Sequence, residues 1–117
     1  MLHLVPYPQK CEIISEEYHA IHGSIYAEME TWRSICDSFC AKLQQRLGAM
    51  AKYEPFADIA IIYDPLVQTD FYIMDTVGNV VIRAYTRKGA KRALSRLLQL
   101  LQYEGGELRV QGFLIED

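Results

Sequence analysis

The sequence predicts an α+β fold in which a long N-terminal helix packs on a mainly antiparallel four-stranded sheet. Two patterns favour this fold. Apolar residues recur at helical spacing from residue 18 to residue 50, and short segments rich in β-branched and aromatic residues follow from residue 57 onwards. Half of the 117 residues are hydrophobic, which is usual for one domain with its own core. We therefore expect residues 1–117 to form a single domain with the element order α-β-β-β-α-β.

The first predicted element is a helix from about Ser15 to Ala51. Ser15 is a good N-cap, and two glutamates follow it in the first turn. At about 100° per residue the apolar side chains form one stripe, which we expect to face the sheet. The central members of the stripe are Ile25, Met29, Trp32, Cys36, Phe39 and Leu43. At 1.5 Å per residue this helix would be about 54 Å long, which is longer than a domain of this size is wide.

The opposite side of the predicted helix carries small, uncharged residues. A solvated helix face normally carries long charged residues, which are better helix formers, whereas small residues let a second backbone approach closely. The candidate contact residues are Ala20, Ala27, Ser34, Ser38 and Ala41. We expect a second copy of the chain to cover them in a two-fold homodimer. The alternatives are coverage by the chain's own N-terminal segment or second helix, and simple exposure.

The later elements are shorter and follow one another closely. The sequence predicts a buried strand over 57–63, a hairpin of Phe71–Met74 and Val80–Tyr85, a helix over 87–103 and a last strand over Leu108–Ile115. Thr86 is a candidate N-cap for the second helix, and Gly105-Gly106 would stop it.

The hairpin turn has two interpretations. Gly78-Asn79 could form a two-residue loop, or residues 75–78 could form a type I turn with Asp75 first and Gly78 fourth. We prefer the second interpretation, because it lets the Asp75 carboxylate accept N–H groups of the turn.

A basic cluster is the best functional lead. The net charge of the chain is −3, yet residues 87–96 contain no acidic side chain and five basic ones, Arg87, Lys88, Lys91, Arg92 and Arg96. Cations are unfavourable at a helix N-terminus, and anions are favoured there. The cluster could bind an acidic protein partner, or nucleic acid or another anion. It could also be an ordinary solvated face, because the helical wheel places it opposite the leucines.

The residues that could carry chemistry form no strong motif. His19 and His22 lie three residues apart, but no further ligands appear at a diagnostic spacing, so we expect no metal site. Cys36 and Cys40 both lie in the apolar stripe, where we expect core packing. The acidic residues are scattered, and no phosphate-binding or nucleophile motif is present, so no cofactor or catalytic residue is assigned.

These observations favour a non-enzymatic protein-interaction module, such as an adaptor, chaperone, inhibitor or immunity-type protein, acting as a homodimer. The first alternative is binding of nucleic acid or an anionic ligand through residues 87–96, which the acidic remainder of the chain disfavours. The second alternative is an enzyme or ligand-binding protein with a pocket between sheet and long helix, near Trp32 and His22. Three cysteines, and no sign of a secretory signal or membrane span, indicate a cytoplasmic protein.

Overall fold

The computed structural model describes residues 9–117, which form one eight-stranded mixed sheet and two α-helices. The elements in chain order are β1 Lys10–Ile21, β2 Ser24–Ala27, a 3-10 helix Glu30–Trp32, α1 Arg33–Leu47, β3 Lys52–Tyr53, β4 Ile59–Tyr63, β5 Tyr72–Asp75, β6 Val80–Ala84, α2 Arg87–Leu100, β7 Gln102–Glu104 and β8 Glu107–Glu116.

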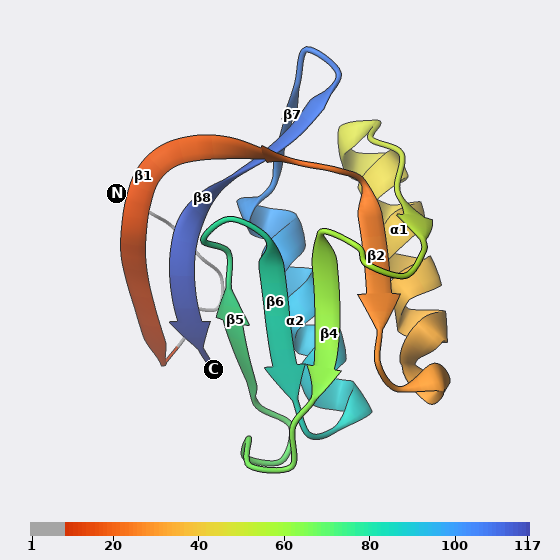
Figure 1. The fold of residues 1–117 in the computed structure, drawn as a ribbon, viewed down its shortest axis with the longest axis vertical. Helices are drawn as coiled ribbons and strands as arrows, with labels where there is room; N and C mark the ends of the chain where they lie inside the picture. Colours follow the sequence, from red (N-terminus) through yellow and green to blue (C-terminus); the bar gives the residue numbers. More distant parts are fainter. Residues whose placement is uncertain (1–8) are drawn as a thin grey trace.

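The sheet combines an antiparallel half with a parallel half. Its strand order is β1-β8-β5-β6-β4-β2-β3, and β7 adds to β8 as a hairpin. Strands β1, β8, β5 and β6 pair antiparallel, whereas β6, β4, β2 and β3 pair parallel. The long strand β1 bends across the top of the sheet in Figure 1 and leads into β2 on the far side.

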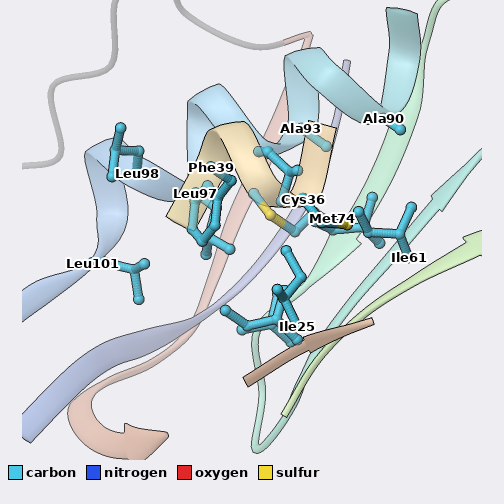
Figure 2. Close-up of a cluster of buried hydrophobic side chains, with 14 of the residues drawn as sticks. Ile25, Cys36, Phe39, Ile61, Met74, Ala90, Ala93, Leu97, Leu98 and Leu101 are labelled. Carbon is cyan, nitrogen blue, oxygen red and sulfur yellow. The ribbon is translucent and has the colours of Figure 1, made fainter. Parts of the chain in front are cut away.

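Both helices lie on the same side of the sheet, behind it in Figure 1. The core forms where their apolar faces meet the inward side chains of the strands. Figure 2 shows Cys36 and Phe39 of α1 and Leu97 of α2 gathered with Ile25 and Met74 of the strands. These five side chains are at most 3% exposed. Neither helix in residues 9–117 is long and apolar enough to cross a membrane.

The predicted fold class is wrong in its first element. Residues 10–27 form strands β1 and β2, and only the part of the apolar stripe from Trp32 onwards lies at a helix. The chain therefore has two helices of ordinary length on an eight-stranded mixed sheet, in place of a long helix on a four-stranded antiparallel one.

Irregular pairing removes the regular alternation that would identify β1 as a strand. Ile13 pairs with Phe113, Ser15 with Gly112 and His19 with Val110, so the register shifts twice and β1 contributes the extra residues. Such bulges interrupt the alternation of inward and outward side chains that identifies a strand. Tyr18 and Ile21 of β1 are three residues apart, as in a helix, but Tyr18 is exposed and Ile21 is buried, so they do not share one buried face.

The predicted homodimer face does not exist as one surface. Ala20 lies on β1 and Ala27 is buried in the core on β2, whereas Ser34, Ser38 and Ala41 lie exposed on α1. Because no single helix joins these residues, the homodimer that they predicted loses its basis.

The later elements were predicted more closely. The β4 strand, the β5–β6 hairpin, α2 and β8 all form near their expected positions. The Asp75 carboxylate accepts the Val77 N–H at 2.9 Å, which is the local role that the preferred turn interpretation gave to Asp75. Residues 77–79 form bends. The prediction for Gly105-Gly106 is wrong: helix α2 ends at Leu100, and the two glycines form the β7–β8 turn, both with positive φ.

Candidate functional site

The five residues of the basic cluster do not share one exposed face. Arg87 donates to the Ser34 hydroxyl of α1 at 3.1 Å, and the Lys88 Nζ lies 3.9 Å from the Asp70 carboxylate. Lys91 is exposed beside a shallow groove between α1 and α2. Arg92 and Arg96 turn towards the sheet. The interpretation of the cluster as an ordinary solvated face is therefore wrong for Arg96, which is buried.

Arg92 and Arg96 hold the end of strand β8 against helix α2. The Asp117 carboxylate lies 3.0 Å from Arg92 and 3.6 Å from Arg96. The Asp117 side chain is 12% exposed and that of Arg96 is 4% exposed, so water screens this charge cluster little. Arg92 also donates to the Asp70 carbonyl at 2.7 Å. We call this arrangement of Arg92, Arg96 and Asp117 the β8 clamp.

Tyr72 completes the surroundings of Arg96. The Arg96 Nε donates to the Tyr72 hydroxyl at 3.3 Å. Burial raises the pKa of Tyr72, and the hydrogen bond from Arg96 opposes that rise. Two of the five predicted anion-binding residues are thus committed to internal partners, which weakens the case for a nucleic-acid surface.

The two histidines are separated by the bend of the chain. His19 lies 2.6 Å from the Gly78 carbonyl, whereas His22 lies 3.0 Å from the Asp58 carboxylate. Among the described residues, His22 lines a groove to which Trp32 does not contribute, and Trp32 is buried. Within residues 9–117, no group of three metal-ligating side chains comes together.

The cysteines are free thiols, and Cys36 packs in the core as predicted. Burial, with smaller contributions from Cys40 and Asp37, raises the pKa of Cys36 from 9.0 to about 12, and Arg33 opposes the rise. Burial also raises the pKa of Cys40 and of Cys11. Raised pKa values keep these thiols protonated, and a protonated thiol is a poor nucleophile.

A groove that the sequence did not reveal lies beside the β7–β8 hairpin. It has a volume of about 450 Å³ and is lined by residues 20–23, by Met50 and by the hairpin residues Tyr103 and Glu107. We call it the hairpin groove. The dipeptide Gly105-Gly106 could have indicated the hairpin that forms one wall of this groove, because Gly-Gly between two strand-like segments favours a tight hairpin.

The carboxylates that line the larger grooves are already paired with basic groups. Glu107, in the hairpin groove, accepts from Arg109 at 2.9 Å. A second groove of about 450 Å³ is lined by Glu116 and Asp117, which pair with Lys10 and with the β8 clamp arginines.

Comparison with known proteins gives no match in sequence. No protein-family model matches this chain. No curated protein matches it either.

The fold, in contrast, is similar to a segment of solved glycoside hydrolases. An exo-β-N-acetylglucosaminidase of family GH20 from Vibrio harveyi superposes with a TM-score of 0.88 at 18% identity, over 97% of this chain and 18% of that one. The Streptomyces plicatus N-acetyl-β-hexosaminidase superposes with a TM-score of 0.77 at 19% identity, over 94% of this chain and 25% of the enzyme. The β-N-acetylhexosaminidase of Bacteroides fragilis superposes with a TM-score of 0.73 at 20% identity, over 97% of this chain and 24% of the enzyme.

At these identities the likeness shows a shared fold. This chain spans only about a fifth to a quarter of each of these enzymes.

Proposed function

We propose that this chain is a structural part of a glycoside hydrolase of the N-acetyl-β-hexosaminidase type. The observation that carries the proposal is the close superposition of nearly the whole chain on one segment of such an enzyme. The same kind of enzyme recurs among neighbours from three different bacteria. This supports a glycosidase part over the adaptor, chaperone or inhibitor expected from the sequence.

We place the chemistry outside residues 9–117. The carboxylates Glu107, Glu116 and Asp117 are each held by a basic partner, and the buried thiols have raised pKa values. A general acid needs a carboxyl group that can hold and release a proton at the scissile bond. We expect the rest of the hydrolase to supply that group, while this chain supports it.

Immunodepletion of a native host extract tests the proposal. An antibody raised against the chain should remove hydrolysis of p-nitrophenyl N-acetyl-β-glucosaminide from the extract and recover it in the precipitate. Hydrolysis of p-nitrophenyl β-glucoside should stay in the supernatant. The isolated 117-residue chain should hydrolyse neither substrate. A precipitate that contains the chain but has no N-acetylglucosaminide hydrolysis would contradict the proposal.

A further inference from the structure

We propose that the hairpin groove binds an N-acetylhexosamine residue of a neutral saccharide. The choice of sugar rests on the proposed function, whereas the site itself rests on the geometry of the groove. It would be a binding site and not a catalytic one, because Glu107 is the only carboxylate that residues 9–117 contribute to its lining, and Glu107 is paired.

The size and the openness of the groove fit a small ligand. Its volume of about 450 Å³ lies within the range of about 300–1,000 Å³ that is typical of ligand pockets. The turn of the hairpin leaves its backbone accessible, since a Cβ atom at Gly105 or Gly106 would meet nothing within 4 Å. Glycines of this kind let a ligand approach the main chain closely.

The charges around the groove favour a neutral ligand. Among residues 9–117, the one acidic side chain of the lining, Glu107, lies 2.9 Å from Arg109. The His22 ring lies 3.0 Å from the Asp58 carboxylate and so already has a hydrogen-bond partner. An ionic ligand would have to compete with these pairs, whereas a hydroxyl or amide group can add a hydrogen bond to an atom that is already paired.

The remaining lining suits the two kinds of surface that an acetylated sugar presents. Tyr103 is 38% exposed and offers a flat apolar ring with a polar tip. The Met50 side chain is 74% exposed, and a flexible thioether adapts well to a small apolar group such as the methyl of an acetamide. His22 and Glu107 supply polar atoms for the hydroxyls of the sugar.

Amide chemical shifts give a direct test on the isolated chain. Titration of the ¹⁵N-labelled chain with N,N′-diacetylchitobiose should shift the Gly105 and Gly106 amides along a saturable curve. Gly48 and Gly78 also have positive φ and open surroundings but lie outside the groove, so their amides should stay in place. Cellobiose, which lacks the acetamide groups, should bind about tenfold more weakly or less. Equal shifts from both sugars, or no shift from either, would overturn the proposal.

Two variants locate the binding, each with a matched control. Ala20→Arg fills the groove from an exposed position on β1, and Ala41→Arg makes the same change on exposed α1. Tyr103→Ala removes the ring, and Tyr85→Ala removes a similarly exposed tyrosine elsewhere. The two groove variants should weaken chitobiose binding about tenfold or more, and the two controls should leave it unchanged. If the Ala20→Arg variant still bound chitobiose with the affinity of wild type, the binding site could not be the hairpin groove.

This test and the immunodepletion fail independently of each other. Depletion of hydrolase activity together with no glycine shift would remove the groove proposal and leave the proposed function. Saturable glycine shifts without any precipitated activity would leave a saccharide-binding chain that is not part of a hydrolase.

Discussion

Gly89 is a residue whose identity is dictated by its surroundings. It lies in the first turn of α2, beside the cap in which the Gly89 N–H donates to the Thr86 hydroxyl at 3.2 Å. A Cβ atom at Gly89 would overlap the Phe71 carbonyl, which is backbone and cannot rotate away. The segment before β5 can therefore cross helix α2 only where a side chain is absent.

Gly89→Ala should therefore lower the free energy of unfolding by about 1–3 kcal/mol, as overpacking does. Helix propensity alone would predict an increase in the free energy of unfolding, because alanine favours a helix by about 1 kcal/mol over glycine. Denaturant unfolding measures the difference. Ser95→Ala, at an exposed position of the same helix, should leave stability within about 0.5 kcal/mol. A Gly89→Ala protein that is more stable than wild type would refute the close contact.

Cys36 should make stability depend on pH in the alkaline range. Its pKa is raised from 9.0 to about 12 in the folded chain. The protonated Cys36 thiol therefore contributes fully to the free energy of unfolding below pH 9. This contribution is lost as the pH rises towards 12, because between these pH values the thiol ionises in the unfolded chain but not in the folded one. The loss is at most about 1.4 kcal/mol per pH unit. The stability of Cys36→Ala, although lower at pH 7, should fall less steeply between pH 9 and 11 than that of wild type. Parallel curves of unfolding free energy against pH for wild type and Cys36→Ala would contradict a raised pKa of Cys36.

The sequence predicted well those residues whose role is local. Thr86 caps α2, and Asp75 accepts an N–H group of its own turn, because both interactions join positions two or three residues apart. The partner of Arg96 could not be predicted in this way. Asp117 lies far along the chain from Arg96, and the fold alone brings them together.

At the scale of elements, the β8 clamp joins the end of a central strand to a helix. The backbone of Asp117 pairs with Tyr72 in both directions, at 2.8 and 3.1 Å, while its carboxylate holds Arg92 and Arg96. Loss of the carboxylate would leave a buried guanidinium without its counter-charge.

Asp117→Asn should therefore cost about 3 kcal/mol of unfolding free energy. Lys10→Ala breaks the neighbouring pair with Glu116, in which both side chains are well exposed, and should cost less than about 1 kcal/mol. Thermal or denaturant unfolding of the two variants gives the comparison. Equal costs would show that the β8 clamp is no stronger than a surface ion pair.

The strand β4, the β5–β6 hairpin, helix α2 and strand β8 were predicted near their positions, α1 was predicted only as part of a longer helix, and strands β1, β2, β3 and β7 were missed. The α1 and α2 helices, the β4 strand and the β5–β6 hairpin keep a constant period over their length. Strand β1 carries two register shifts, and its Tyr18 and Ile21 fall at the helical spacing of the apolar residues of α1. The conformation of β1 is decided by its pairing with β8, which is distant in sequence. Local propensity contains no information about such a contact.

At the scale of the whole molecule, the hairpin groove depends on the element that the sequence pattern missed. Its walls come from the β1–β2 turn, from Met50 and from the β7–β8 hairpin, three segments far apart in the chain. A long helix over residues 15–51 would place residues 20–23 elsewhere, so the groove could not be predicted without the sheet. The basic cluster, visible in the sequence, is instead divided between the β8 clamp and the surface.

We propose that this chain is one part of an N-acetyl-β-hexosaminidase-type enzyme, and a renatured activity gel tests this proposal most directly. Host proteins would be separated by size, renatured, overlaid with a fluorogenic N-acetyl-β-glucosaminide and then blotted with an antibody against the chain. We predict that the fluorescent band and the immunoreactive band coincide, at a mass well above the 13.5 kDa of this chain. An immunoreactive band that lies apart from every fluorescent band would contradict the claim.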